Sequence, residues 1–234
     1  ALSYLAHRPE MIMFSAFDHL LINVPNIATA NAEYSVLLGQ PITANMVRLG
    51  NVDIRLQEVS QTTQPRLAAL ALQDKDLAPN EPRALDGGPR GIPLLHANSR
   101  DCAYHDDTPS DTGIYAVDHL VLQTADAQAC IDLFRDQLGL RLALDQEMPE
   151  WGGRMLFFRL GKMTLEVIQN LDKPPPTDFF WGITFLCKNI DQTVASLDAR
   201  GVVHSPIRKG RKPGTRVSTI KSHCLGLPTL LIGQ

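Results

Sequence analysis

The chain has 234 residues, of which 44% are hydrophobic and 20% charged, and its formal net charge is −3. These proportions are ordinary for a globular protein and supply apolar side chains for one large or two small cores. The weak negative charge offers no basic field for nucleic acid, and no apolar run approaches the roughly 20 residues of a membrane span. The four cysteines form no CxxC pair, which is typical of a reducing compartment, so we expect a cytoplasmic protein.

Residues 1–14 come before the first regular pattern and are expected to form an N-terminal extension. The segment lacks the charged start and long apolar core of a signal peptide. It also has no initiating Met, so Met11 and Met13 are candidate natural starts, with vector-derived residues before them.

An internal repeat is the strongest organising signal. Residues 17–39 read FDHLLINVPNIATANAEYSVLLG and residues 117–139 read VDHLVLQTADAQACIDLFRDQLG, at a constant offset of 100 residues. Each copy starts with an apolar run that predicts a strand and continues with a helical pattern. Asn26 and Asp126 are predicted helix N-caps, and Gly139 is a predicted C-cap.

The second copy continues as three further strands, which complete a βαβββ unit. Short turns rich in glycine separate these strands. The predicted strands are 140–145, 154–160 and 163–169.

The rest of the chain repeats this order with varying clarity. Residues 179–234 form another unit, with a helix over 190–200 and a basic turn over 209–214. Its strands are predicted at 180–187, 202–207, 215–221 and 228–232.

The first copy closes with a strand over 51–58. An eroded unit is predicted to follow over residues 66–97, with strands at 66–73 and 91–97. The stretch between them is too rich in Pro and Gly for a helix. Residues 98–113 are predicted to link the two halves.

Units that open on Asp-His-Leu and close on Leu165-Glu166-Val167 resemble the vicinal oxygen chelate superfamily. It includes glyoxalases, methylmalonyl-CoA epimerases, extradiol dioxygenases and fosfomycin- and bleomycin-resistance proteins. The resemblance covers most of residues 15–234 and implies an α+β fold in which repeated βαβββ modules form two cupped mixed sheets. The glyoxalase-like halves would then be residues 15–113, including the linker, and residues 114–234.

The resemblance also implies a divalent metal in a cup, such as Fe, Mn, Ni or Zn, held by His and Glu and able to polarise substrate oxygens. Residue by residue, it implies His119, Glu166 and His19 as metal ligands, with Glu166 or a metal-bound water as the catalytic base. The alternative for His119 and Glu166 is a structural pair that shares a hydrogen bond. For His19 the favoured alternative is a hydrogen-bonded core histidine beside Asp18.

This ligand set is incomplete in the other units. Alignment of the units places Thr184 at the His position and Leu231 at the Glu position of the last unit, and Arg55 opposite Glu166 in the first. A complete site therefore needs a donor from elsewhere, and His19 contributes only if the first and third modules share a cup. The other candidate donors are His204, His223, Gln57 and Glu58.

Four residues are predicted to bind substrate. Trp151 and Arg154 lie beside the second strand of the third unit and offer a pocket wall and a cation. Arg208 and Arg211 belong to a loop with five cations in nine residues, which suits capture of an anion. The alternative for this loop is a solvated hairpin tip, and the simpler alternative for Trp151 is core packing.

The resemblance therefore implies a metal-dependent lyase, isomerase or ring-cleaving dioxygenase that acts on a small oxygenated anionic metabolite. The alternative is a metal-free protein of the same fold that binds or sequesters a small molecule. The expected partner is a small-molecule ligand, with neither nucleic acid nor membrane. Exposed sheet edges also favour a homodimer.

Overall fold

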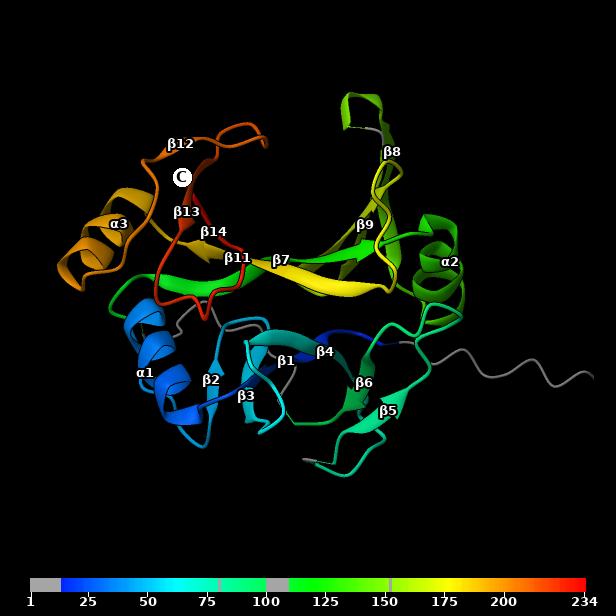
Figure 1. The fold of residues 1–234 in the computed structure, drawn as a ribbon, viewed down its shortest axis with the longest axis horizontal. Coiled ribbons are helices and arrows are strands. Elements are labelled where there is room, and N and C mark those ends of the chain that lie inside the picture. Colours follow the sequence, from blue (N-terminus) through cyan, green and yellow to red (C-terminus); the bar gives the residue numbers. More distant parts are fainter. Residues whose placement is uncertain (1–13, 80, 100–109, 152) are drawn as a thin grey trace, which may run out of the picture.

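A computed structural model describes residues 14–79, 81–99, 110–151 and 153–234. The fold consists of two mixed sheets stacked face to face, with the helices at their flanks (Figure 1). The six-stranded sheet has the order β2-β3-β1-β4-β6-β5. Its strands are β1 (Phe17–Val24), β2 (Met46–Arg48), β3 (Asp53–Glu58), β4 (Arg66–Gln73), β5 (Arg83–Leu85) and β6 (Leu94–Ala97).

The eight-stranded sheet contains all the strands of the C-terminal half, in the order β12-β13-β14-β11-β7-β10-β9-β8. Both of its ends curl away from the six-stranded sheet (Figure 1). Its strands are β7 (Ile114–Thr124), β8 (Arg141–Met148), β9 (Gly153–Leu160), β10 (Met163–Asn170), β11 (Phe179–Cys187), β12 (Arg208–Lys209), β13 (Arg216–Ile220) and β14 (Thr229–Gly233).

The pairing of opening strands decides which modules share a sheet. Strand β1 pairs antiparallel with β4, and β7 pairs antiparallel with β11. The first and second modules therefore form one sheet and the third and fourth the other. This confirms the predicted α+β fold of repeated modules in two mixed sheets, and it excludes the arrangement in which the first and third modules share a cup.

Three helical segments cross over between strands, as the repeat predicted. They are α1 (Ile27–Leu38), α2 (Ala127–Ile131), which continues as the π-helical turn η1 (Asp132–Gln137), and α3 (Ile190–Ala199). The side chains of Asn26 and Asp126 accept hydrogen bonds from backbone N–H groups in the first turns, which confirms both N-caps. Gly139 follows η1 with a φ of 72°, a left-handed conformation that glycine adopts without a Cβ clash.

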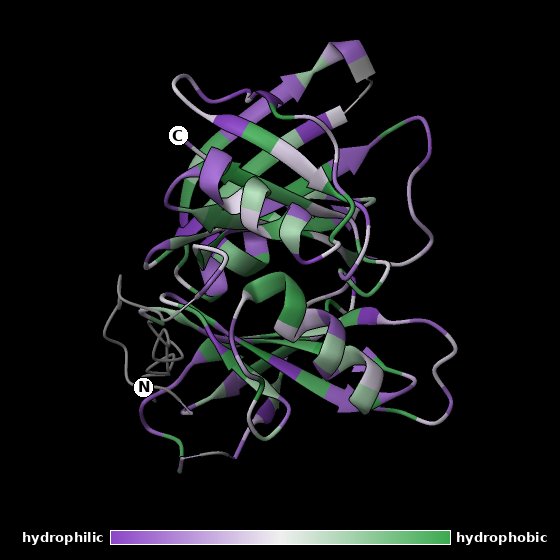
Figure 2. Cartoon of the chain, turned by 90° about the vertical axis from the view of Figure 1, so that its left-hand side faces the viewer, coloured by the Kyte–Doolittle hydropathy of each residue, from purple (hydrophilic) through white to green (hydrophobic). Residues whose placement is uncertain are grey.

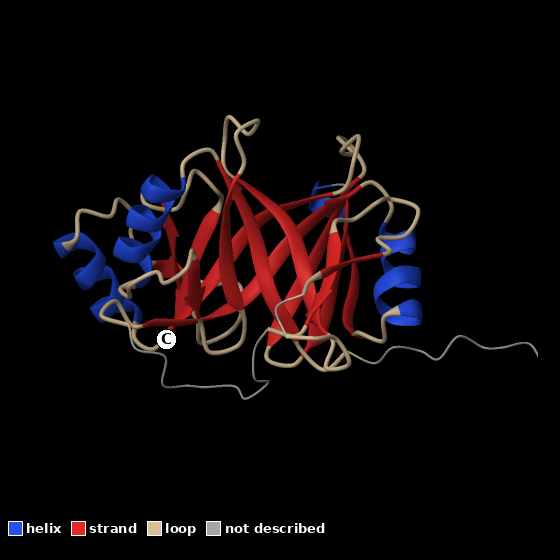
Figure 3. Cartoon of the chain, turned by 90° about the horizontal axis from the view of Figure 1, so that it is seen from below, coloured by secondary structure: helices blue, strands red, loops and turns tan. Residues whose placement is uncertain are grey.

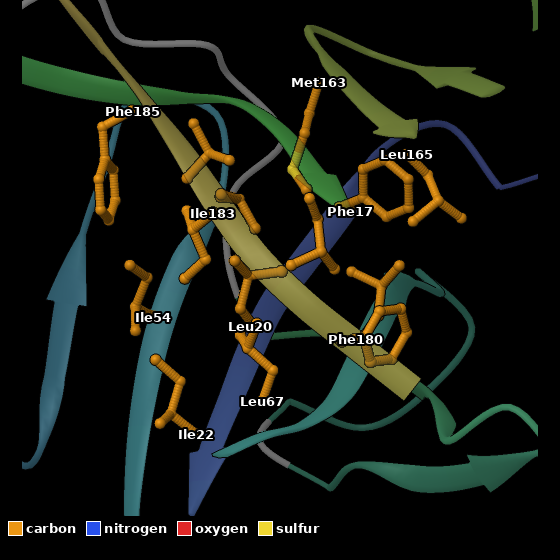
Figure 4. Close-up of a cluster of buried hydrophobic side chains, with 14 of the residues drawn as sticks. Phe17, Leu20, Ile22, Ile54, Leu67, Met163, Leu165, Phe180, Ile183 and Phe185 are labelled. Atoms are coloured by element: carbon orange, nitrogen blue, oxygen red, sulfur yellow. The ribbon is translucent and has the colours of Figure 1, made fainter. Parts of the chain in front are cut away.

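The core lies between the two sheets. Figure 4 shows Phe17, Leu20 and Ile22 of β1 facing Phe180, Ile183 and Phe185 of β11. Leu20 and Ile22, like Ile183 and Phe185, follow the period-two pattern of a strand, whereas a bulge adds one residue between Phe17 and Leu20 and between Phe180 and Ile183. In Figure 2 the hydrophobic segments lie mainly in the sheets, while hydrophilic residues dominate the outlying loops.

A turn of the first module also ties the halves together. The side chain of Asn51 donates to the carbonyl oxygens of Val117 and Lys162 at 2.6 and 3.1 Å, and its own carbonyl accepts from the Val117 N–H at 3.0 Å. The view from below shows the two sheets overlapping, with helices at both ends (Figure 3). These buried hydrogen bonds fix the first module against β7, the strand that carries His119.

The predicted second unit is confirmed at both of its strands, β4 and β6, and the described residues between them contain only the short strand β5. The strand predicted over 202–207 is wrong. That segment makes a single bridge, His204 to Ile220, because Val202 bonds back to helix α3 and Pro206 has no N–H to offer a ladder. No helix of the described residues is long and apolar enough to cross a membrane.

Candidate functional site

The candidate site starts from a bulge in β7. Val117 pairs with Phe185 and His119 with Thr184, so Asp118 is an extra residue without a partner on β11. A β-bulge of this kind redirects side chains locally. Here it brings the Asp118 carboxylate beside the ring of His119, with 2.8 Å between Oδ2 and Nδ1. Leu120 lies in the core, so His119 faces the opposite side, which we call the outer face of the eight-stranded sheet.

His119 contacts three polar side chains at once. Besides Asp118 at Nδ1, its Nε2 lies 2.8 Å from Thr184 Oγ1 and 3.2 Å from Glu166 Oε2. Burial favours the neutral form of Asp118, but the hydrogen bond from His119 and nearby cations outweigh burial and lower the pKa of Asp118. Asp118 is therefore an acceptor, and Nδ1 carries a hydrogen that fixes the orientation of the ring.

Glu166 reaches this point from β10, which runs parallel to β7. Leu165 and Val167 on either side of it are fully buried in the core, so Glu166 faces outward beside His119. Burial raises the pKa of Glu166, and the charges of His119 and Arg211 only partly offset this. Oε2 of Glu166 lies 3.2 Å from His119 Nε2, within ion-pair distance, so the carboxyl group and the imidazole are placed to interact directly.

The fourth module supplies no metal ligand at the matching positions. Thr184 pairs with His119 across the sheet and takes the His position, as predicted. The predicted match of Leu231 to Glu166 is wrong by one residue. Thr164 pairs with His119 and Leu230 with Thr184, so the residue two further along each closing strand is Glu166 in one module and Ile232 in the other.

The first module places His19 in the six-stranded sheet, so the structure does not bring it together with His119 and Glu166. His19 is buried and its Nδ1 lies 2.6 Å from Asp18 Oδ1, again at a bulge. Arg55 takes the position equivalent to Glu166, as predicted, since it pairs with Leu21 two residues beyond His19.

The alternative donors are engaged elsewhere or lie away from the site. Glu58 accepts the N–H of Ile27 at the start of α1, and Gln57 pairs with Asn23 at the end of β1. The ring of His204 contacts Asp198 and the carbonyl of Ser205. His223 lies in the turn before β14, with Nδ1 2.9 Å from Ser222 Oγ.

The expected divalent metal is therefore not matched by the side chains present. In the described parts of the chain no three His, Cys, Asp or Glu side chains are grouped to hold a metal ion. His119 and Glu166 are two donors, while a catalytic metal centre usually has three protein ligands. Thr184 and Ile232 occupy the positions where the fourth module would complete the set.

The predicted substrate-binding residues divide between the two faces. Arg154 does not lie on the outer face. It pairs with Gln169, whose neighbour on β10, Ile168, faces outward, so Gln169 and Arg154 face the opposite way. The Arg154 guanidinium forms a bidentate ion pair with Asp145 at 2.7–2.8 Å. Trp151 lies in the short 3₁₀ turn η2 (Pro149–Trp151) between β8 and β9.

Arg208 and Arg211 belong to the basic hairpin, residues 208–216, which joins β12 to β13. The Arg208 guanidinium lies 3.5 Å from Thr219 Oγ1, and the charge of Arg211 partly offsets the rise that burial causes in the pKa of Glu166. This predicted loop is thus a hairpin, and its charges act on the pair formed by His119 and Glu166.

The prediction did not include Asp118, Arg159 and Lys212 as site residues. Both cations lower the pKa of Asp118, and Arg159 lies in register with Thr164 and His119. The Asp-His repeat was visible in the sequence, but only the bulge shows that Asp118 turns to the same face as His119. The placement of Arg159 follows from the alternation of β9 once the outward position of Phe157 is known.

Comparisons with known proteins agree with this architecture. Residues 118–219 match the family model described as "Glyoxalase/Bleomycin resistance protein/Dioxygenase superfamily". They are thus a domain of this superfamily, to which the sequence pattern showed a resemblance. No curated protein matches the chain by sequence.

One solved structure extends the likeness in fold to both halves. A triple mutant of 4-hydroxymandelate synthase from Streptomyces coelicolor aligns over 94% of this chain and 92% of its own, with a TM-score of 0.65 and 14% identity. Methylmalonyl-CoA epimerase from Mycobacterium tuberculosis aligns over 54% of this chain and 93% of its own, with a TM-score of 0.45 and 17% identity. At such identities the likeness shows the fold alone.

Proposed function

We propose that this chain, which carries a glyoxalase-superfamily domain, is an enzyme that moves a proton to and from carbon in a small oxygenated organic anion. The observation that carries the proposal is the Asp118–His119–Glu166 arrangement, with Nδ1 of the imidazole held and Nε2 facing a carboxyl group at 3.2 Å. Paired titratable groups with one orienting partner are the usual parts of general acid–base catalysis.

Glu166 is the proposed base. It removes a proton from a carbon next to a carbonyl group, and the electron pair of that C–H bond moves onto the carbonyl oxygen. His119 or a cation of the basic hairpin stabilises the negative oxygen, and return of the proton to the same or a neighbouring carbon gives an isomer. A buried carboxylate with a raised pKa is a stronger base at neutral pH than an exposed one.

Charge around the pair favours an anionic substrate. Arg159, Arg211 and Lys212 are exposed, and all three act electrostatically on Asp118 or Glu166. In the strand order, β9 with Arg159 lies on one side of β7, and the basic hairpin of β12 and β13 lies on the other. A carboxylate between them would gain charge-assisted hydrogen bonds.

Deuterium exchange tests the proposal. We expect the protein in D₂O to catalyse exchange at C3 of pyruvate, 2-oxobutyrate or 2-oxo-4-phenylbutyrate, followed by proton NMR. Glu166→Gln should lower the rate by about 100-fold or more, within the range for loss of a general base. Glu147→Gln, an exposed position that pairs with Arg154 on the opposite face, is the matched control. Equal exchange by wild type and Glu166→Gln would refute the proposed base.

A metal-free binding protein is the second candidate. Thr184 and Ile232 at the ligand positions favour it, as do the exposed aromatic side chains of Phe179 and Trp181. Metal content of protein purified without chelator separates it from a metalloenzyme. A stoichiometric metal that His119→Ala loses would support metal-dependent chemistry. A metal-free wild type that binds organic anions but exchanges no deuterium would support the binder.

A further inference from the structure

The register of the eight-stranded sheet places a row of charged and polar residues, interrupted only by Leu230, across the outer face. His119 pairs with Thr164 on one side and with Thr184 on the other, and the row continues along the same face in both directions. Arg141 and Arg159 lie at one end of the row. Thr219 lies at the other end, where its hydroxyl contacts the guanidinium of Arg208. In sheet order the row is Arg141, Arg159, Thr164, His119, Thr184, Leu230 and Thr219.

The two rows beyond His119 have a different character. They are the next outward-facing positions along the same strands, and most of their members are apolar. Glu166 is the one ionisable residue in them. The first of these rows is Leu144, Phe157, Glu166, Val121 and Gly182, and the second is Gln146, Met155, Ile168, Gln123 and Phe179.

Two aromatic side chains beside these apolar rows are open to solvent. Phe179 is 43% exposed and Trp181 is 45% exposed. Trp181 is the extra residue of a second irregularity in β11, between Phe180 and Gly182. Exposed apolar residues scattered singly are normal, but here they continue an apolar surface that ends at a titratable pair. Such a surface suits the apolar part of a ligand.

We infer that the ligand of this face is an amphipathic organic anion, with its carboxylate on the Arg159 side of the His119 row and its apolar body across Phe157, Met155 and Phe179. Successive rows on one face lie about 7 Å apart, since residues rise about 3.3 Å each along a strand. The apolar body therefore starts about one row from the anionic group, a separation that a short chain ending in a phenyl ring spans. Glu166 lies at the border between the two parts.

This inference deepens the proposed function, because it names the class of substrate on which Glu166 would act. The division of the face into a polar row and apolar rows affects ligand binding, which can be measured without catalysis. A binding experiment can therefore refute the ligand class, and deuterium exchange can refute the proposed chemistry, independently of each other.

Three probes test the inference on the full chain by isothermal titration calorimetry. They are 4-phenylbutyrate, its neutral amide 4-phenylbutanamide, and propionate. We expect 4-phenylbutyrate to bind at least about 10-fold more tightly than either of the others, because each lacks one of the two recognised parts. Equal affinity for the acid and the amide, or for 4-phenylbutyrate and propionate, would overturn the inference, as would no binding of 4-phenylbutyrate.

Matched variants then locate the two parts. Phe179→Ser should weaken 4-phenylbutyrate several-fold and leave propionate unchanged, whereas Leu171→Ser, at another exposed apolar position, should change neither. Arg159→Gln should reduce the preference for acid over amide, whereas Arg135→Gln, in η1, should not. All four sites are exposed or lie on the surface of an element, and a urea transition like that of wild type checks folding.

Each outcome has a definite meaning. If the probes bind with the expected polarity and no deuterium exchange occurs, the proposed chemistry fails and the ligand class stands. If Phe179→Ser and Leu171→Ser behave alike, or Arg159→Gln keeps the full preference for the acid, the placement of the ligand on this face is refuted.

Discussion

The two sheets contain the same Asp-His bulge and use it differently. In β1, Asp18 is buried and accepts hydrogen bonds from His19, from the N–H of Ser99 at 2.8 Å and from the Ser99 hydroxyl. In β7, Asp118 contacts His119, whose ring remains 20% exposed and also meets Glu166. The bulge sets the orientation of an imidazole in both sheets, and the neighbours of that imidazole decide what it can do.

The neighbours differ at three equivalent positions. Arg55 stands in the six-stranded sheet where Glu166 stands in the eight-stranded sheet, Ala71 stands where Thr184 stands, and Asp53 stands where Thr164 stands. An Asp-His pair alone therefore marks the architecture, and an acid at the Glu166 position, two residues beyond the partner of the histidine on the closing strand, marks the candidate site.

Asp18→Asn should have the largest effect on this comparison. Its carboxylate holds three donors in a buried place, and an amide presents a donor to at least one of them. We expect the free energy of unfolding to fall by about 3 kcal/mol, measured by urea denaturation at pH 7. Asp118→Asn should cost less than half as much, because its carboxylate is partly exposed. Equal losses for both would mean that the two bulges are structurally equivalent.

The same variant has a predictable pH dependence. Burial favours neutral Asp18, but hydrogen bonds from His19 and Ser99 outweigh burial and hold its pKa below the usual value. A lowered folded pKa gives stabilisation that is complete above the unfolded value of about 3.9 and is lost as the pH falls through the folded pKa. The difference between wild type and Asp18→Asn should therefore shrink in acid.

Asp118→Asn should mainly affect chemistry. Residues that orient a functional imidazole typically contribute 10- to 100-fold, so we expect deuterium exchange to fall by about that factor. Nitrogen-15 NMR of the His119 ring gives a second measure, because loss of the Asp118 acceptor should shift hydrogen away from Nδ1. Asp18→Asn, where it remains folded, should leave the His119 ring signals unchanged. Unaltered ring signals in Asp118→Asn would argue against the positioning role.

Much of this architecture could be predicted because it depends on local pattern. The repeat, the N-caps at Asn26 and Asp126, and strand β4 follow from periodicity and short-range hydrogen bonds. Strand register could not be predicted as closely. The mistaken choice of Leu231 over Ile232 is a slip of one residue, which exchanges the two faces of a strand.

Long-range pairing explains the remaining differences. The sequence left open which modules share a sheet, and only the pairing of β7 with β11 separates His19 from His119. Arg154 looked available because its partner, Asp145, lies on another strand. Bulges are equally hidden, since nothing in the Asp-His-Leu pattern shows that Asp118 lacks a partner on the neighbouring strand.

Thr184→Ala makes the eight-stranded sheet resemble its counterpart at the position of Ala71. The change removes the hydroxyl that lies 2.8 Å from His119 Nε2 but keeps Glu166. We expect a loss of about 1 kcal/mol in the free energy of unfolding, the usual value of one hydrogen bond. Deuterium exchange should fall only a few-fold if Glu166 is the base. A loss as large as that of Glu166→Gln would instead make the Thr184 hydroxyl essential to proton transfer.

The smallest effect is expected on the face that the site does not use. Arg154 and Asp145 form a partly exposed ion pair, and the hydrogen bond from Arg154 lowers the pKa of Asp145. The stabilisation should be present above the unfolded pKa of about 3.9 and disappear as the pH falls through the folded pKa. Asp145→Asn should therefore cost less than about 1 kcal/mol at pH 7, and this cost should decrease as the pH falls below about 3.9, measured by urea denaturation. Because Arg154 faces away from His119, binding of 4-phenylbutyrate should not change, and a weaker affinity would return Arg154 to the site.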